Sequence, residues 1–318
     1  MTSAHTAEQR DSALPEEPPV LPLDPHRPLA VGRILGTLSA ILVAGWLAYA
    51  VIVNPNIHWD VIVDHQFDDR VLHGLWVTIE LTVLSMAIGV PIGVGVAVMQ
   101  MSANPLLRSL AGAYTWFFRG TPVLVQLLFW FNLGLLFPRL ELGVPFGGPK
   151  LFSVEASAVI TPFVAGLLGL AINEGAYMAQ IVRAGIMSVD HGQREAAESL
   201  GMSRRKVLTR IILPQAMRII IPPTGNQFIS MLKTTSLVSV IAGADLLTTV
   251  SRIYLGNFEV ISMLVVASIW YLLLTTIASV GQHYIERHYS RGVHSPQRLS
   301  RRVRHNLTGN PAMGAHDA

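Results

Sequence analysis

Long uncharged apolar runs, rather than an alternation of apolar and polar positions, dominate this chain. Each run approaches or exceeds the roughly 18–20 residues that a helix needs to cross about 30 Å of hydrocarbon. The five clearest runs are 34–53, 81–107, 120–138, 156–173 and 260–284. A sixth, about 214–240, contains two prolines and a lysine, which a membrane helix tolerates where neighbouring helices or a water-lined cavity satisfy the freed backbone groups. The pattern therefore predicts an all-α integral membrane protein with six transmembrane helices.

The composition agrees with this prediction and excludes several kinds of chemistry. Only 14% of the 318 residues are charged and 51% are hydrophobic, whereas about a quarter of the residues in globular domains are charged. The absence of cysteine excludes a disulfide framework, a thiol nucleophile and a cysteine metal site. No Gly-Lys pair occurs, so the chain lacks a phosphate-binding loop and is not itself an ATPase. His58, His65 and His73 are spaced too loosely for a metal site on one helix, and we expect them to be solvated.

The first apolar run is predicted to stay in the mature protein. It contains Ala48, Tyr49 and Ala50, which look like a signal-peptidase site, but it is longer than a signal core and follows an acidic, proline-rich segment. The composition of residues 1–30 predicts a disordered tail. With six spans, both tails and the loops near 102–118 and 183–213 lie on one side, which holds most of the Lys and Arg residues. The positive-inside rule therefore places both termini in the cytoplasm and the spans in the inner cell membrane.

A polar segment between the fourth and fifth runs has the signals of a helix, a sharp turn and a second helix. Asp190 is a suitable N-cap, and Gln193 stands three residues later, as in a capping box. Gly201 suits the left-handed residue that ends a helix, and Ser203 suits the cap of the next. Physical reasoning alone leaves two interpretations open, a connector lying on lipid headgroups or an element that transmits force.

The residues of this segment resemble the EAA signature of ATP-binding-cassette (ABC) importer permeases, E-A-A-x3-G-x9-I-x-L-P. The matching positions are Glu195, Ala196, Ala197, Gly201, Ile211, Leu213 and Pro214. In that family the segment is a cytoplasmic coupling helix that docks in a cleft of the ATP-hydrolysing subunit. The resemblance implies that these residues, together with Glu198, couple the chain to an ATPase.

Three further elements resemble the polar amino-acid branch of that family, the histidine, glutamine and glutamate permeases. Arg119, Gly120, Thr121 and Pro122 match an RGTP element. Segments 175–186 and 233–237 resemble the stretches before the coupling segment and after the fifth span. Gln180 departs from the branch, which usually carries Glu there.

The resemblance implies a permease subunit that moves a polar amino acid and is not itself an enzyme. The implied partners are ABC ATPase subunits, which hold ATP and Mg, an external substrate-binding protein, and a second permease, identical or different. The chain itself is expected to bind no cofactor, metal or nucleic acid. The implied organisation is a cytoplasmic tail (1–30), an additional N-terminal helix (31–56), a permease domain with a five-helix core (70–286) and a basic tail (287–318) on anionic lipid.

Ionisable side chains within the spans are candidates for function, because a charge in hydrocarbon costs at least about 2.5–3.5 kcal/mol. We expect Asn173, Glu174 and Tyr177 to line the substrate path, with Lys233 nearby, and expect Gly175 to loosen the helix there. The alternative is that Glu174 pairs with Lys233 or Arg119 to hold the bundle together.

Other features of the spans favour packing, or leave the role open. Gly89, Gly93 and Gly95 predict a face for close helix packing. Gln126 and Asn132 suit either bonds between helices or a pore.

Two other functional classes remain. An ion-gradient-driven secondary transporter of small polar solutes predicts internal repeats with paired broken helices, and no convincing second copy of the fifth span is present. An intramembrane enzyme needs a catalytic pair, and Glu174 has no obvious partner for one. The sequence does not distinguish acidic, basic and amide amino acids as the substrate.

Overall fold

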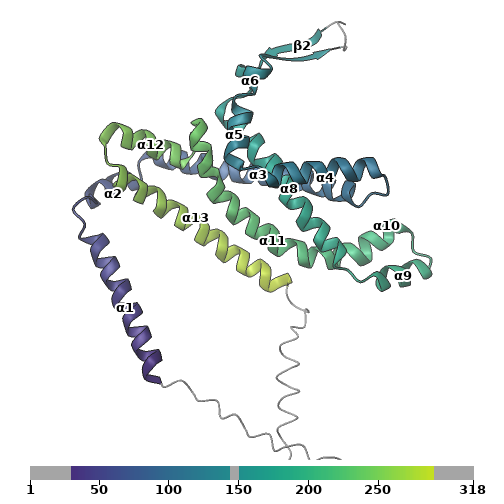
Figure 1. Ribbon diagram of the computed structural model, residues 1–318, viewed down its shortest axis with the longest axis horizontal. Helices are drawn as coiled ribbons and strands as arrows, with labels where there is room; N and C mark the ends of the chain where they lie inside the picture. The colour runs from purple at the N-terminus through teal and green to yellow at the C-terminus, as the bar shows by residue number, and fades with distance from the viewer. Residues whose placement is uncertain (1–29, 144–149, 290–318) are drawn as a thin grey trace, which may run out of the picture. The chain divides into compact units, whose positions relative to one another are not determined.

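The computed structural model describes residues 30–143 and 150–289 (Figure 1). The predictions for the tails at 1–30 and 287–318 therefore fall almost entirely outside the described residues. The chain divides into two compact units, Met1–Ile57 and His58–Ala318. In the first unit, α1 (Ala30–Ile52) has one charged residue, Arg33, in its first turn, and its segment Ile34–Ile52 has a mean hydropathy of 2.0, in agreement with the first predicted span.

The second unit is a helical bundle with one small hairpin. Its helices are α2 (Trp59–Gln66), α3 (Asp69–Gln100), α4 (Pro105–Gly120), α5 (Val123–Phe131), α6 (Leu133–Leu136), α7 (Ala156–Val159), α8 (Pro162–Met187), α9 (His191–Ser199), α10 (Arg204–Val207), α11 (Leu213–Thr234), α12 (Leu246–Asn257) and α13 (Val260–Tyr289). A π-helical turn (Leu208–Ile212) joins α10 to α11, and a 3₁₀ helix (Thr235–Ile241) follows α11. Strands β1 (Arg139–Gly143) and β2 (Lys150–Glu155) pair antiparallel.

The predicted boundaries of the second span and the following loop are wrong. The helix begins at Asp69, where the Asp68 side chain accepts a hydrogen bond from the Arg70 amide, and it ends at Gln100. The predicted loop at 102–118 is mostly α4, whose first turn is capped by Asn104 with Pro105 behind it. Asn104 and Pro105, the start signal of α4, lie within the apolar run 81–107 and were therefore read as part of the span before it.

Two other predicted runs are also divided differently. The run 120–138 forms two helices, α5 with nine residues and α6 with four. They meet at Asn132, whose side-chain amide donates a hydrogen bond to the Leu128 carbonyl of α5. The run 156–173 is the short α7 plus the first part of α8, which continues for 26 residues to Met187 without a break at Gly175. The prediction of a loosened helix at Gly175 is therefore wrong.

The prediction of a wholly α-helical chain is wrong at the hairpin. Residues 139–142 alternate polar and apolar side chains, which is the period of a strand, and Arg139 pairs with Glu155 in the register. Among the described residues, three helices are long and apolar enough to cross a membrane, α1, α3 and α13. The bent pair of segments Arg204–Ile241 and Leu246–Asn257 raises that number to four if it forms one span.

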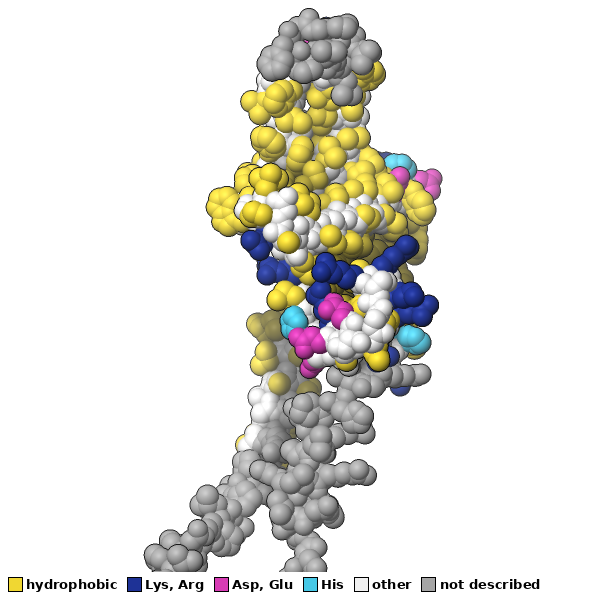
Figure 2. Space-filling view, turned by 90° about the vertical axis from the view of Figure 1, so that its right-hand side faces the viewer, with side chains coloured by type: hydrophobic (Ala, Val, Ile, Leu, Met, Phe, Trp, Pro, Cys, Tyr) yellow, Lys and Arg dark blue, Asp and Glu magenta, His cyan; other side chains and the backbone are white. Residues whose placement is uncertain are grey.

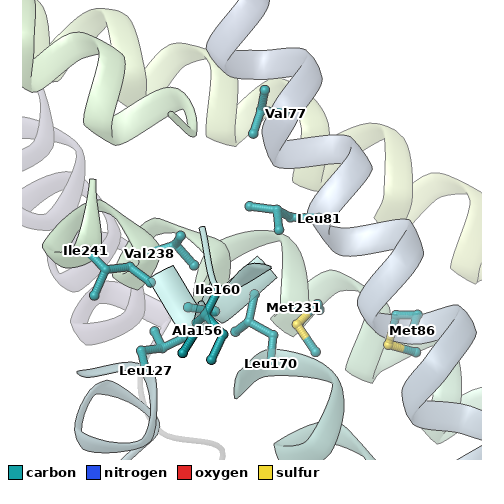
Figure 3. Packing of buried hydrophobic residues seen from close by; sticks show 11 residues of the cluster. Val77, Leu81, Met86, Leu127, Ala156, Ile160, Leu170, Met231, Val238 and Ile241 are labelled. Atoms are coloured by element: carbon teal, nitrogen blue, oxygen red, sulfur yellow. The ribbon is translucent and has the colours of Figure 1, made fainter. Parts of the chain in front are cut away.

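The core of the second unit lies where α3, α5, α8 and the 3₁₀ helix meet (Figure 3). Leu81, Leu127, Leu170 and Val238 are fully or almost fully buried there. Glycines allow α3 and α8 to approach closely, because an added Cβ at Gly89 would lie 2.9 Å from the Glu174 Cβ. The predicted packing face is thus confirmed at Gly89 and Gly93, but Gly95 faces open space.

His58, which was predicted to be solvated, is exposed and also joins two elements. His58 Nδ1 lies 2.7 Å from the Glu259 carboxylate, just before α13, and the His58 amide donates to Ser262 Oγ. The hydrogen bond and charge of Glu259 raise the pKa of His58 above its usual value. Trp270 Nε1 also donates to the Gln66 carbonyl, so α2 is fixed along the first half of α13.

Candidate functional site

The RGTP element lies at the break between α4 and α5. α4 ends at Gly120, Thr121 is extended, and Pro122 precedes the first turn of α5. The buried Gln126 amide donates to the Phe118 carbonyl (3.0 Å), the Thr121 carbonyl (3.1 Å) and Thr121 Oγ1 (2.8 Å). One side chain therefore satisfies carbonyls that the end of α4 leaves without partners.

Asn173 fixes this break to α8. Its side-chain amide donates to the Phe118 carbonyl (2.7 Å) and to Gln126 Oε1 (3.3 Å), and the residue is 7% exposed. The Asn173 amide thus has a structural task, since it holds the end of α4 against the middle of α8.

Arg119 and Tyr177 meet on the outer side of the same junction. The guanidinium carbon of Arg119 lies 5.3 Å from the centre of the Tyr177 ring, within the range of a cation–π contact. Both side chains are exposed at the surface of this unit. The pair therefore presents a cation and a phenol beside the buried Asn173.

Glu174 is a buried carboxylate with a neutral partner. The residue is 4% exposed, and both carboxylate oxygens lie 3.3 Å from Gln227 Nε2 of α11. No cation of the described part of the chain forms an ion pair with Glu174, so the alternative pairing with Lys233 or Arg119 is wrong. A buried carboxylate without a cationic partner is costly, which makes Glu174 a candidate for function rather than for stability.

The structure does not bring Lys233 into this group. It is exposed near the C-terminal end of α11. It stands six residues beyond Gln227, about 9 Å further along the helix. Lys233 is therefore not close to Glu174 and Gln227, and its position gives no support to the prediction that it lines the substrate path.

Sequence reasoning missed two amides. Gln227 is the partner of Glu174, and Gln100 of α3 accepts from Gln180 of α8 (3.4 Å) and donates to Thr115 of α4 (3.1 Å). Gln100 interrupts an apolar stretch, which was the available signal, whereas Gln227 follows Thr224, Gly225 and Asn226 and has no such contrast with its neighbours. Gln180, the departure from the family pattern, thus lies in a neutral polar network between three helices.

The predicted helix after α8 is confirmed as α9. The Asp190 carboxylate accepts from the Gly192 amide at 2.6 Å, and Gly201 has φ +74°. The Gly201 amide donates to the Glu198 carbonyl and the Met202 amide to the Ala197 carbonyl, the two bonds that close a helix at a left-handed glycine. Ser203 stands at the cap position of α10 but makes no side-chain cap bond there.

The outward face of α9 differs from its inner face. Ala197 is 5% exposed and contacts the chain itself, whereas Glu195, Ala196 and Glu198 are exposed. Glu198 pairs with Arg194 at 3.1 Å. Basic side chains surround this end of the molecule (Figure 2), so α9 presents a small, partly acidic face within a basic rim.

The rest of the EAA segment forms the start of α11. Ile211 lies in the π-helical turn, and Leu213 and Pro214 are the first residues of α11. Gln215 Nε2 donates to the Ile211 carbonyl (2.8 Å) and to Gln193 Oε1 of α9 (2.7 Å). Gln193 therefore joins α9 to α11 instead of completing a capping box.

Neither region has the ligands of a metal site. Within the described ranges, no group of three or more His, Asp or Glu side chains is placed to hold a metal ion.

The sequence matches a known family model over most of the helical bundle. The model, described as "Binding-protein-dependent transport system inner membrane component", matches residues 89–291. The match includes the RGTP break, the whole of α8 and the EAA segment.

Curated relatives and solved structures agree with that match. The chain is 44% identical over 262 residues to the arginine transport system permease protein ArgU of Corynebacterium glutamicum, with 82% of this chain and 81% of ArgU covered. It is 36% identical over 245 residues to the L-cystine transport system permease protein TcyB of Bacillus subtilis, covering 77% and 96%. A crystal structure of an amino acid ABC transporter with histidines aligns with a TM-score of 0.59 at 36% identity, covering 69% of this chain and 94% of that one.

Proposed function

This chain belongs to the family of binding-protein-dependent transport system inner membrane components, and we propose from that premise how it works as the permease subunit of an amino-acid ABC importer. The observation that carries the mechanism is the exposed α9, because its EAA residues match the family signature and Glu195, Ala196 and Glu198 are exposed on it. A separate ATPase subunit supplies the energy, and this chain supplies the path through the membrane.

We propose that α9 is the coupling helix and docks on the ATPase. Glu195, Ala196 and Glu198 face the partner, while Ala197 holds α9 against its own chain. The Gln193–Gln215 hydrogen bond and the short π-helical turn connect α9 to α11, so displacement of α9 moves the helix that carries Gln227. ATP binding then favours one arrangement of the permease over another.

The arrangement in the membrane rests on the family and on the charge pattern. We propose six spans, with α1 added to a five-helix core, and both termini in the cytoplasm. A second permease, identical or different, completes the path, and an external binding protein delivers the amino acid.

We propose a cationic amino acid as the substrate class. The relative of 44% identity is described as an arginine transport system permease protein, and within the described residues the hydrogen-bond partner of the buried Glu174 carboxylate is the neutral amide of Gln227. A cationic side chain passing Glu174 would supply the missing counter-charge. Tyr177 lies one turn after Glu174 on α8, and Arg119, in the last turn of α4, stacks on its ring. The pair forms the edge of this path, and Arg119 suits the substrate carboxylate.

The test of this function is transport in proteoliposomes that contain the chain, its neighbouring ATPase and its binding protein. We expect uptake of radiolabelled arginine only with ATP and all components present. Uptake driven by an ion gradient without the ATPase would favour the secondary-transporter alternative.

Glu174→Gln is expected to reduce uptake of a cationic amino acid at least tenfold, because it removes the counter-charge but keeps the shape and the Gln227 contact. Stimulation of ATP hydrolysis by the loaded binding protein is expected to remain. Gln180→Glu is the control, because it changes one charge on the same helix but outside the proposed path, and it restores the residue that is usual in the family. Unchanged uptake in Glu174→Gln, with assembly intact, would remove Glu174 from the path.

A further inference from the structure

A long apolar slot lies between α3, α8, α11 and α13. Its volume is about 920 Å³. Among the described residues that line it, only Ser102, Thr224 and Gln282 have polar side chains. Of the residues named above for the substrate or the ATPase, Leu213 at the start of α11 lines the slot, whereas Glu174, Tyr177, Arg119 and the exposed residues of α9 do not. The function proposed above therefore leaves the slot unexplained.

One side of the slot is a continuous stripe on α3. Met86, Val90, Val94 and Val98 recur every four residues, and Met101 continues the stripe past the end of the helix. At a rise of 1.5 Å per residue, the distance from Met86 to Met101 is about 22 Å. The slot therefore extends over about three quarters of the hydrocarbon layer, which is about 30 Å thick.

The dimensions of the slot suit a hydrocarbon chain. A volume of about 920 Å³ spread over about 22 Å leaves room for an extended acyl chain along the whole length of the slot. A hydrocarbon chain fits and makes the close carbon–carbon contacts that stabilise apolar packing.

Basic residues stand close in the sequence to the residues at one end of the slot. Met101, Ser102 and Leu208 form that end, at the terminus of α3 and the start of the π-helical turn. Arg210 follows Leu208 by two residues, and Arg218 adjoins Met217, another lining residue. Both arginines are exposed, and no ion pair engages either within the described residues. Glu286, which adjoins the lining residue Ile285 on α13, accepts a hydrogen bond from Gln282.

We propose that this slot binds one acyl chain of an anionic glycerophospholipid, with Arg210 and Arg218 at its phosphate. Lipid tails are as apolar as the slot, so the tail alone gives little preference over bulk lipid. The selectivity comes from the headgroup, because basic residues at a membrane surface attract anionic lipid. The site is separate from the amino-acid path and does not depend on which amino acid is carried.

The test uses the full chain in nanodiscs of phosphatidylcholine with a trace of phosphatidylglycerol that carries a photoreactive diazirine in one acyl chain. Mass spectrometry is expected to find adducts on the peptides that contain Val94 and Met217. Unlabelled phosphatidylglycerol is expected to compete at least tenfold better than phosphatidylcholine, and Arg210→Gln with Arg218→Gln to abolish that preference.

Two phenylalanine variants, one inside the slot and one outside it, give a matched comparison of adduct formation. Ala278→Phe, which places a ring in the slot, is expected to reduce these adducts at least tenfold. Val83→Phe, on an exposed position of α3 outside the slot, is expected to leave them unchanged. Adducts spread evenly over exposed faces, or unaffected by Ala278→Phe, would overturn the proposal. A second copy of the chain is the alternative occupant, and Val94→Cys tests for it, because the chain has no other cysteine. Disulfide crosslinks between two copies at position 94 would show that protein, and not lipid, fills the slot.

Discussion

Gly93→Val is expected to prevent assembly of the helical bundle. An added Cβ at Gly93 would fall on the Met178 Cβ and lie 2.9 Å from the Ala179 amide nitrogen. Both groups belong to the middle of α8, where no flexible side-chain end is available to move aside. Overpacking a core typically costs about 1–3 kcal/mol, and a clash with backbone at the main helix contact belongs at or above that range. We expect almost complete loss of the monodisperse peak in size-exclusion chromatography of detergent-solubilised protein.

Gly95→Val is the matched control on the same helix. Gly95 has nothing within 4 Å of the position of an added Cβ, so it tests helix propensity and expression without the clash. We expect it to behave like the wild-type protein, and Gly93→Ala to be intermediate. Equal behaviour of Gly93→Val and Gly95→Val would mean that α3 and α8 do not approach as closely as the structure indicates.

The sequence predicted that α3 has a glycine face, but not which of its glycines contact α8. The small-residue face of α3 was predictable, because glycine spacing near Pro91 is typical of close packing in membranes. The different roles of Gly93 and Gly95 were not, since the rotation of α3 against α8 depends on the whole interface.

Local signals were read correctly where the chemistry is local. Asp190 and Gly201 bracket α9 because each forms its bonds within a few residues. α4 was missed because its start signal, Asn104 and Pro105, lies inside a stretch read as the end of one span and a loop.

The candidate site was predicted in its residues but not in its contacts. Asn173 and Glu174 stood out as polar groups in an apolar run, but their partners Phe118 and Gln227 lie 55 and 53 residues away in the chain. A sequence alone does not show which of the available polar groups faces a buried carboxylate. Opposite charge suggested Lys233 or Arg119 as the partner of Glu174, whereas the packing of α8 against α11 places the neutral amide of Gln227 there.

Ala196→Arg is expected to abolish transport while leaving the permease folded. Ala196 is exposed on α9, next to Glu195, and the proposed docking would bury it against the ATPase. An unpaired charge forced into a buried contact costs about 3–5 kcal/mol, which weakens docking by a factor of about 10²–10⁴. We expect loss of uptake, loss of ATPase co-purification, and an unchanged melting temperature of the isolated permease.

The neighbouring alanine separates docking from folding. Ala197 is 5% exposed within the chain itself, so Ala197→Arg is expected to lower the melting temperature before any partner is added. Ala196→Ser, which keeps the small size, is expected to retain uptake. If Ala196→Arg transports normally with its ATPase bound, α9 does not present Ala196 to a partner, and the force must enter the bundle elsewhere. Loss of melting temperature in both arginine variants would make α9 a structural brace of α11, because the Gln193–Gln215 bond already joins the two helices.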